Sequence, residues 1–412
     1  MARLLSPTSK SLAVLRPLQQ YASTPHRYFS SAIPSLQKPG YPAPARPPKD
    51  SKWDLTKLKE HVQTAVLVEL HTIPLYLFSM YAVRPEGRDP VKKLRSVLKQ
   101  EMLHLSLAGN LLCAIGGNPV LYHQEYTPKY PCEIFYEPIK LQLQPPHKES
   151  IKTFIKASLE KPELSPMPYP APGNPLPDYN SIGAFYQSLI RGLKVLATKP
   201  GQNLFDPATA SRQFGPEDGI YPDGTDPNDR LVKITDLNSA LAALHTIVEQ
   251  GEGTTGGNSL RGPSHWKIFQ ELENQAIPYH PTIENPETSK FEGDIKTAML
   301  AFDAAYSYLL LSTEKSWTTT GNDRSKLIGN IDSLMGSILS PIAKFLVAQK
   351  LEGRDKYAAP PFNYYEFTNE KPARKHVADT IQAALDKYQG NSRLKSALRA
   401  ANGLSDLPQS NV

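Results

Sequence analysis

The sequence predicts a mainly α-helical protein, and three observations support this fold class. Apolar residues recur at the spacing of an amphipathic helix along 97–117, 295–312 and 327–349. Helix start and stop signals flank such stretches, whereas the strand-like pattern that we identify is the short segment "IKLQLQ" (139–144). The chain also contains 39 prolines among 412 residues, so long irregular connections should separate the helices.

The first two helices have the clearest boundary signals. The first is expected to begin after Asp54, a favourable N-cap residue, and to run to about Val83. Pro74 should kink this helix or break it locally, because proline has no amide hydrogen. The second helix should begin near Pro90, a suitable first-turn residue, and end at the glycine pair that starts with Gly116.

The middle of the chain alternates between irregular and helical segments. A long crossover is expected over 118–180, with the short strand at 139–144 and a short helix near 147–160. A third helix should follow over 181–196. After another irregular stretch, Asp236 is the expected cap of a fourth helix.

The C-terminal part is predicted to be helical as well. Further helices are expected over 264–275, 290–318 and 324–350, where apolar residues again follow helical spacing. Residues 368–412 should form a charged amphipathic segment and a polar tail. No internal repeat is visible.

The net charge of the chain is concentrated at its N-terminus. Residues 1–49 contain seven Lys and Arg residues and no acidic residue, so the total of +6 leaves −1 for residues 50–412. This nearly neutral body gives no indication of nucleic-acid binding. The chain has two cysteines, Cys113 and Cys132, which excludes a disulfide framework and a zinc site built on cysteines.

Residues 1–35 have the composition of a mitochondrial transit peptide, because they are rich in Arg and Ser and contain no acidic residue. The segment "RYFSS" resembles the arginine-led cleavage sites of matrix-targeted proteins and predicts cutting near Phe29 or Ser30. We therefore expect a mitochondrial matrix protein; the alternative is a disordered tail on a cytoplasmic protein. Residues 36–53 are proline-rich and are predicted to be a linker in either case. No uninterrupted apolar run reaches the roughly 18 residues of a membrane span.

Two polar residues in the second helix suggest a metal site. Glu101 and His104 are three residues apart and therefore share one face of this otherwise apolar helix. A carboxylate in an apolar core is costly unless it is paired or bound to a cation. Lys99, the nearby base, lies on another face. The pair alone is a weak signal, because Glu-x-x-His also occurs on solvated helices.

Other helices supply matching residues. Glu69 lies in an apolar stretch of the first helix, Glu249 and Glu252 form a second pair at the end of the fourth, and His265 follows. Four glutamates and two histidines match the ligands of a carboxylate-bridged di-iron bundle. Carboxylate and imidazole ligands suit iron, one or two ions, or manganese. The alternative is a set of independent glutamates that are capped or salt-bridged.

The order of these motifs resembles the ferritin-like family of the iminophenyl-pyruvate dimer synthases, typified by the bacterial violacein and rebeccamycin pathway enzymes. The matching segments are "VELHTIPLYLFSMYAV" (68–83), "KQEMLHLSLAGNLLCAIGGNP" (99–119), "FIKASLEKPE" (154–163), "SIGAFYQSLIRGL" (181–193), "IVEQGEG" (247–253), "SHWKIFQEL" (264–272) and "YAAPPFNYYEF" (357–367). The resemblance implies a ferritin-like helical bundle over about 54–367, with long irregular insertions and extra C-terminal helices. It also implies metal ligands at Glu69, Glu101, His104, Glu249, Glu252 and His265.

The sequence departs from the family pattern in two places. Ferritin-like di-iron proteins usually take one carboxylate from the third helix, but this chain has Ala184 there and no acid in the apolar stretch. The second pair is Glu-x-x-Glu, with the histidine displaced to His265. A site with a single metal ion therefore remains open. His245, one turn before Glu249, is a rival ligand to His265.

The resemblance implies an O2-dependent oxidase or oxygenase with non-haem iron, acting on a small metabolite derived from an amino acid or an imine. The pathway members are also described with haem, but we find no haem ligand signature in this chain. The alternative is a ferritin-like protein that binds or handles iron without an organic substrate. A third option is a scaffold that has lost the metal, which the retention of six candidate ligands argues against. A homo-oligomer is compatible with the sequence.

Overall fold

The computed structural model describes residues 44, 46–133, 136, 139–158, 179, 182–201, 203–220, 231–252 and 264–408, without the side chains of 158, 251 and 252. The chain divides into two compact units, residues 1–35 and residues 36–412. The first unit contains the predicted transit peptide and its cleavage site at Phe29 or Ser30, and it lies outside the described residues. All that follows concerns the second unit.

The prediction of a mainly α-helical chain is confirmed. The described residues contain eleven α-helices and a single pair of very short strands: α1 (Leu55–Ala82), α2 (Arg88–Ala114), β1 (Cys132–Glu133), β2 (Lys140–Leu141), α3 (Lys148–Ser158), α4 (Ile182–Ala197), α5 (Leu237–Glu252), α6 (His265–Glu273), α7 (Gly293–Ser316), α8 (Gly321–Asp332), α9 (Ser340–Leu346), α10 (Ala373–Lys387) and α11 (Ser392–Asn402).

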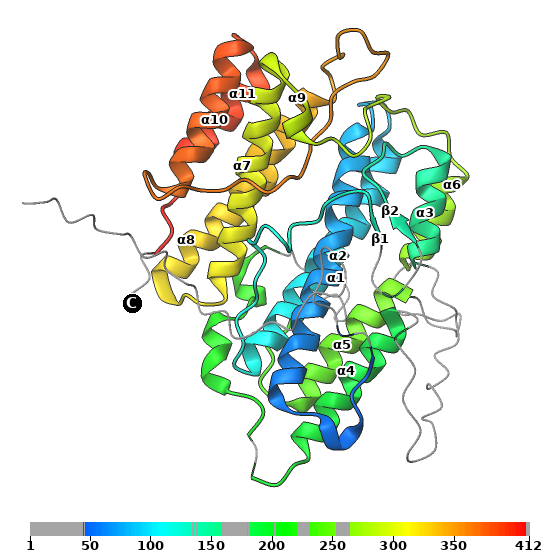
Figure 1. The fold of residues 1–412 in the computed structure, drawn as a ribbon, viewed down its shortest axis with the longest axis vertical. Helices are drawn as coiled ribbons and strands as arrows, with labels where there is room; N and C mark the ends of the chain where they lie inside the picture. The colour runs from blue at the N-terminus through cyan, green and yellow to red at the C-terminus, as the bar shows by residue number, and fades with distance from the viewer. Residues whose placement is uncertain are drawn as a thin grey trace, which may run out of the picture. The chain divides into compact units, whose positions relative to one another are not determined.

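Four of these helices form the bundle that contains the candidate site. α1 packs along α2 over most of its length, α4 packs against α1 and α5, and α5 also contacts α2 (Figure 1). α6 contacts α2 and α5 and packs on its other side against α3. The core of the bundle is therefore enclosed by helices from widely separated parts of the chain.

The C-terminal helices form a second helical group. α7 packs against α10 and α8, and α11 packs against α10 and α9 (Figure 1). Between α8 and α9 the chain forms a π-helix, Ser333–Leu339, so the predicted helix over 324–350 is present but is interrupted by wide turns. Pro341 lies two residues after this segment and has no amide hydrogen, so one α-helical hydrogen bond is missing here.

The helix boundaries follow the signals in the sequence. The Asp54 side chain accepts a hydrogen bond from the amide of Lys57 (2.8 Å), and Asp236 accepts one from the amide of Ser239 (2.8 Å). At the end of α2, Gly116 takes the left-handed conformation (φ 73°), which costs glycine little. These caps place the first, second and fourth helices where the sequence predicts them.

Two local predictions differ from the structure. α1 runs through Pro74 without a break, so of the two expected effects of this proline the local break is absent and the kink stays a prediction. The predicted strand over 139–144 is reduced to two residues, which pair antiparallel with Cys132–Glu133. Beyond this pair, the backbone of Leu143 bonds to Asn285 instead: its carbonyl accepts from the Asn285 amide (3.0 Å) and its amide donates to Asn285 Oδ1 (2.8 Å).

Asn110, on α2, joins distant segments of the core by hydrogen bonds. Its amide nitrogen donates to the carbonyls of Phe214 (2.7 Å) and Val232 (3.0 Å). Its oxygen accepts from the Phe214 amide (2.8 Å) and from Trp317 Nε1 (3.1 Å). The preceding Gly109 allows the indole to lie directly on the helix, since a Cβ there would be 2.1 Å from Trp317 Cζ2.

The end of the proline-rich segment packs on the bundle. Trp53 is 1% exposed, and its ring occupies the space that a side chain at Gly192 of α4 would take. Arg191 binds the carboxylate of Asp50 through Nε (2.6 Å) and Nη2 (2.5 Å). The end of the predicted linker is therefore packed against α4 before α1 begins.

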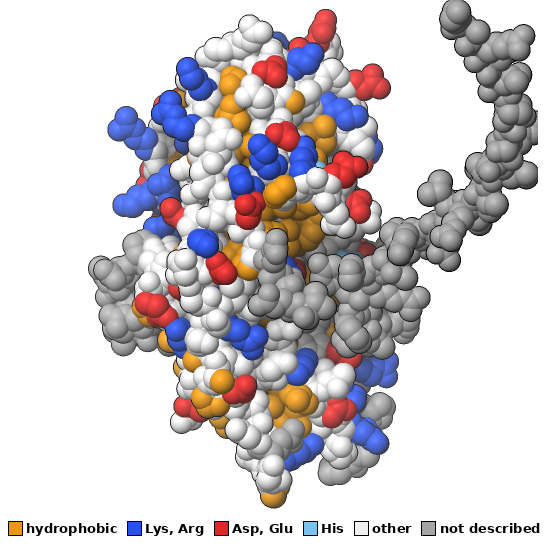
Figure 2. All heavy atoms as spheres, turned by 90° about the vertical axis from the view of Figure 1, so that its left-hand side faces the viewer, with side chains coloured by type: hydrophobic (Ala, Val, Ile, Leu, Met, Phe, Trp, Pro, Cys, Tyr) orange, Lys and Arg blue, Asp and Glu red, His pale blue; other side chains and the backbone are white. Residues whose placement is uncertain are grey.

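The apolar composition of α1 belongs to a helix that is buried in the protein. On the face drawn in Figure 2, basic and acidic side chains are interspersed rather than gathered by sign. Among the helices of the described residues, α1 alone is long and apolar enough to cross a membrane, but 89% of its most apolar window is buried inside the protein. Its position in the centre of the bundle accounts for that composition.

His61 on α1 gives the fold a defined sensitivity to acid. Its ring is buried, Nδ1 lies 2.7 Å from the Lys57 carbonyl, and Nε2 lies 3.1 Å from the Tyr179 hydroxyl. Burial lowers the pKa of His61 from 6.5 to about 4, partly opposed by the Lys57 hydrogen bond. Between these two pH values the unfolded chain binds a proton at this site that the folded chain does not, so stability must fall as the pH falls.

We therefore expect a pH-dependent difference between wild type and His61→Gln. Between pH 7 and pH 4 the wild type should lose about 3 kcal/mol more free energy of unfolding than the variant, because Gln does not titrate. Urea unfolding followed by circular dichroism at several pH values measures the difference. Parallel pH profiles for the two proteins would show that His61 does not have this role.

Candidate metal centre

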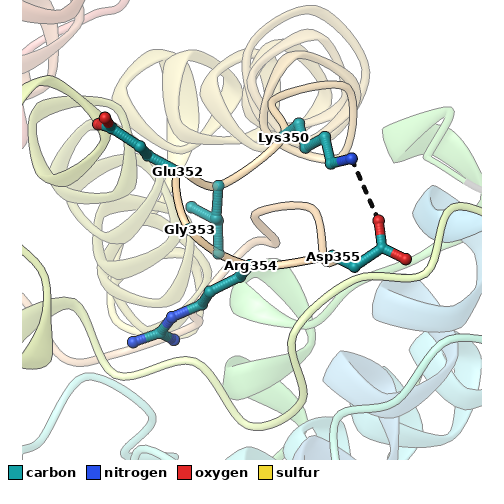
Figure 3. Close-up of a pocket in the computed structure, with 6 residues that line it drawn as sticks. Lys350, Glu352, Gly353, Arg354 and Asp355 are labelled. Carbon is teal, nitrogen blue, oxygen red and sulfur yellow. Dashed lines mark ion pairs between the residues drawn. The ribbon is translucent and has the colours of Figure 1, made fainter.

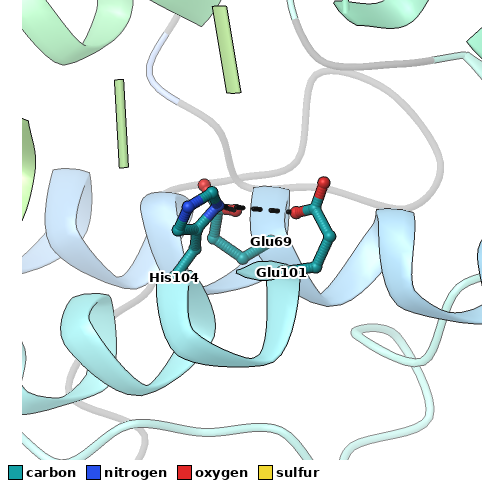
Figure 4. Close-up of side chains that lie close together, drawn as sticks. All are labelled: Glu69, Glu101 and His104. Atoms are coloured by element: carbon teal, nitrogen blue, oxygen red, sulfur yellow. Dashed lines mark ion pairs between the residues drawn. The ribbon is translucent and has the colours of Figure 1, made fainter. Parts of the chain in front are cut away.

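Three of the predicted ligands come together inside the bundle. Glu69 on α1 and Glu101 and His104 on α2 each offer one ligand atom, and these atoms all lie within 4.8 Å of one another. The side chains point toward each other from the two adjacent helices (Figure 4). Glu69 and Glu101 are each 5% exposed, and His104 is 1% exposed. The i, i+3 spacing on α2 and the close packing of α1 on α2 together produce this convergence.

His265 extends the group from a third segment, α6. It is the first residue of α6, which Ser264 caps by accepting a hydrogen bond from the Lys267 amide. The His265 ring is 1% exposed, and its Nδ1 lies 3.2 Å from Glu101 Oε1. The centres of the His104 and His265 rings are 5.8 Å apart. The histidine that follows α5 in the chain thus reaches the same carboxylate as the histidine of α2.

Glu101 lies between the two imidazoles. Its Oε1 faces His265 Nδ1, whereas its Oε2 lies 3.7 Å from His104 Nδ1. Thr72 on α1 donates a hydrogen bond to the same Oε2 (3.0 Å). Each oxygen of this carboxylate therefore has an imidazole on its own side, which is the arrangement a bridging ligand requires.

The two remaining members of the group are held by side chains from α4 and α5. The Tyr186 hydroxyl donates to Glu69 Oε1, and Glu69 Oε2 lies 3.4 Å from His104 Nδ1. On the opposite edge of the His104 ring, Nε2 lies 2.8 Å from Gln250 Oε1. An amide oxygen can only accept a hydrogen bond, so His104 Nε2 carries the hydrogen and donates it to Gln250. The other ring nitrogen, Nδ1, faces the carboxylates.

The pKa values of these side chains reflect two buried carboxylates that lie beside imidazoles. Burial would raise the pKa of Glu101, but the His104 hydrogen bond and the His265 charge bring it well below its usual value. Burial also raises the pKa of Glu69, against the opposing hydrogen bond from His104. Burial tends to lower the pKa of His104, yet the hydrogen bonds and charges of Glu101 and Glu69 raise it to about 10.

The residues present fit a divalent cation. Among the ion pairs of the described residues, the carboxylates of Glu69 and Glu101 pair only with imidazoles, and no Lys or Arg neutralises them. His265 Nε2 is buried and has no hydrogen-bond partner within the described part of the chain. Two carboxylates and two imidazoles are hard and intermediate ligands of the kind that iron and manganese accept.

For the other predicted ligands, Glu249 and Glu252, the ligand role stays a prediction. Glu249 on α5 is half-buried and is not a member of the close group. The side chain of Glu252, at the end of the same helix, lies outside the described residues. His245, the rival to His265, is exposed. Of the two histidines, the one that faces Glu101 is His265.

Three residues that were not among the predicted ligands also contact the group, namely Thr72, Tyr186 and Gln250. The sequence signal for Gln250 is its position, since it follows the apolar residues Ala243 and Ile247 at helical spacing. In the structure all three side chains are buried. Glu249 is one position out of phase with that face. The helix phase, rather than the residue type, therefore identifies the side chain of α5 that contacts His104.

A surface hollow in the C-terminal part has no connection with these residues. It has a volume of about 530 Å³ and is lined by Lys350–Asp355, a single loop (Figure 3). Lys350 Nζ and Asp355 Oδ1 form an ion pair across it (3.1 Å), and both side chains are more than half exposed. A hollow of this kind offers a ligand no enclosed polar group.

Comparison with known proteins agrees with this architecture. A family model described as "Ferritin-like" matches residues 62–274, just over half of the 412 residues and a range that contains all four grouped side chains. A ferritin-like protein from Caulobacter vibrioides has a similar structure, with a TM-score of 0.51 and 20% identity, over 70% of this chain and 95% of that one. This likeness shows the fold alone.

A curated relative shares sequence over a larger part of the chain. Dichlorochromopyrrolate synthase from Lentzea aerocolonigenes is 24% identical over 332 residues, which cover 71% of this chain. The same alignment covers 31% of the relative, so this chain matches about a third of that protein's length. The extent of the family match, the bundle of α1, α2, α4 and α5, and the buried Glu and His group lead to one conclusion: the chain belongs to the ferritin-like family.

Proposed function

We propose that this protein is a non-haem iron oxidoreductase that uses O2 to oxidise a small metabolite. The observation that carries the proposal is the convergence of Glu69, Glu101, His104 and His265 in the interior of the bundle. A buried pair of carboxylates is costly, and a bound cation removes that cost. Metal binding is therefore the role that best explains why these residues occur in an otherwise apolar core.

The substrate class that we propose is an amino-acid- or imine-derived metabolite. Its support is the resemblance of the chain's motifs to the iminophenyl-pyruvate dimer synthases and the similarity to dichlorochromopyrrolate synthase. Because this chain spans about a third of that relative, the activity of the whole relative is not transferred to it. We therefore propose a class of substrate and no particular compound.

The proposal assigns each side chain a task. Glu101 and His104 would hold the ion from α2, Glu69 would hold it from α1, and His265 would complete the set from α6. Gln250 keeps the hydrogen on His104 Nε2 and leaves the Nδ1 lone pair for the metal. Thr72 fixes Glu101 Oε2 by a hydrogen bond. Side chains held in this way require little rearrangement when the ion binds.

The nuclearity that we favour is two ions. Its support is Glu101, whose two oxygens face different imidazoles, as a bridging carboxylate would. Reduced non-haem iron with open positions supplies electrons to O2 while a nearby organic molecule is oxidised. The chain's own contribution is to fix the ligands and to exclude water by the buried aromatic rings of Tyr76 and Phe269 near His265.

Metal loading and oxygen consumption test this function. Anaerobic addition of Fe²⁺ to full-length protein should raise its free energy of unfolding by about 2.7 kcal/mol at a concentration of 100 times Kd. An oxygen electrode should then record consumption that continues only when a 2-oxo acid and an amine are supplied. Oxygen uptake that stops once the added iron is oxidised would instead indicate an iron-handling protein. Failure of Fe²⁺ and Mn²⁺ to stabilise the protein would contradict the metal site itself.

A further inference from the structure

The third helix of the bundle contributes a phenol to the candidate metal centre. α4 packs against α1 and α5, and Tyr186 on this helix is 1% exposed. Its hydroxyl donates a hydrogen bond to Glu69 Oε1. The sequence has Ala184, and no acid, where the ferritin-like pattern would lead one to expect a carboxylate from this helix. What α4 offers to Glu69 is therefore a hydrogen-bond donor.

The two oxygens of Glu69 consequently have different surroundings. Oε1 accepts the hydrogen bond from Tyr186, whereas Oε2 faces His104 Nδ1 at 3.4 Å. A phenol-to-carboxylate hydrogen bond in a buried site is a strong one, because the acceptor is ionised when a metal is bound. This bond holds the carboxylate in one orientation, with Oε1 on the Tyr186 hydroxyl and Oε2 turned toward His104 Nδ1. The arrangement thus favours ligation through Oε2 alone.

We propose that Tyr186 is a positioning residue that keeps Glu69 a ligand through one oxygen. This inference rests on the proposed function, because it requires a bound metal. Ligation through one oxygen leaves a coordination position that a two-oxygen carboxylate would occupy. That position is then available to O2 or to a polar group of the substrate, which is what an oxygen-using centre needs.

The geometry separates this role from simple space filling. The ring of Tyr186 packs edge-on against Phe185, with centroids 5.5 Å apart, and phenylalanine at position 186 would keep that packing. Only the hydroxyl would be lost in Tyr186→Phe. Tyr308→Phe is a matched control, because Tyr308 is buried on α7 and its hydroxyl donates to the Ser405 carbonyl (2.7 Å), not to a grouped carboxylate.

The test uses Co²⁺ as the metal probe on full-length protein without oxygen. Tyr186→Phe should bind Co²⁺ about 10–100-fold more weakly than wild type, as is usual when a group that orients a ligand is removed. Its visible absorption bands should also change in intensity, because freeing Oε1 allows a higher coordination number. Tyr308→Phe should lower the thermal midpoint while leaving the Co²⁺ affinity and spectrum as in wild type.

The possible results are distinguishable. Wild-type affinity and spectrum in Tyr186→Phe would overturn the role of Tyr186 and leave the metal centre standing. No Co²⁺ binding by the wild type would overturn both proposals. Should Tyr186→Phe fail to fold, infrared difference spectra of the wild type with and without Co²⁺ still decide the matter. A one-oxygen carboxylate ligand gives a wide splitting of its two stretching bands, and absence of any widely split pair contradicts the inference.

Discussion

Glu101→Ala should lose most of its bound iron while keeping the helix content of the wild type. Glu101 is the side chain on which the group depends most, because one of its oxygens faces His265 and the other faces His104. Its removal takes away a ligand and the negative charge that offsets a cation, so we expect metal affinity to fall by at least about 100-fold. His104→Ala should have a similar effect. Metal analysis after gel filtration, with circular dichroism on the same samples, measures both quantities.

A second glutamate provides the control for this experiment. Glu314 on α7 is also largely enclosed, and its carboxylate accepts hydrogen bonds from the amides of Leu121 (3.0 Å) and Tyr122 (3.1 Å). Glu314→Gln should reduce stability through these bonds and leave iron occupancy unchanged. Full iron occupancy in Glu101→Ala or in His104→Ala would show that the ligand assignment is wrong.

Asn110→Leu should lower the free energy of unfolding by about 4 kcal/mol. The substitution leaves the amide and carbonyl of Phe214, the carbonyl of Val232 and the Trp317 indole nitrogen without their bonds to Asn110. Each buried polar group that loses its partner costs about 1–3 kcal/mol, and the shape of leucine compensates only for the lost volume. Urea unfolding at neutral pH gives the difference directly.

An exposed asparagine serves as the reference for that substitution. Asn274 is exposed at the end of α6 and donates one hydrogen bond to the Gln270 carbonyl (2.9 Å). Asn274→Ala should change stability by no more than about 0.5 kcal/mol. A loss below about 1 kcal/mol in Asn110→Leu would mean that water or a shifted backbone replaces the missing bonds, which contradicts the role given to Asn110.

The helices could be predicted from the sequence because their signals are local. Asp54 and Asp236 cap the helices that follow them, and Gly116 ends α2 in the left-handed conformation. The π-helix before Pro341 could not be predicted, because the width of a turn depends on the packing of neighbouring helices. The strand that pairs with Lys140–Leu141 could not be predicted either, because Cys132–Glu133 has no strand pattern in the sequence.

The part of the candidate site that the sequence predicts is the set of polar residues that lie within apolar stretches. Glu69, Glu101 and His104 lie in apolar stretches, which marks them as residues that need a partner inside the protein. Which residues of α5 face them depends on helix phase, so Gln250 is at the site while Glu249 is half-buried beside it. Tyr186 gave no signal, because an isolated tyrosine in an apolar helix is ordinarily a core residue.

The most direct test of the metal centre is a crystal structure of the protein grown with Fe²⁺ or Mn²⁺ without oxygen. Diffraction collected on either side of the metal absorption edge identifies the element and its position. The account predicts anomalous density within about 2.0–2.3 Å of oxygen from Glu69 and Glu101 and nitrogen from His104. Fully loaded crystals that show no anomalous density among these side chains, or that show it only at the surface, would contradict the account.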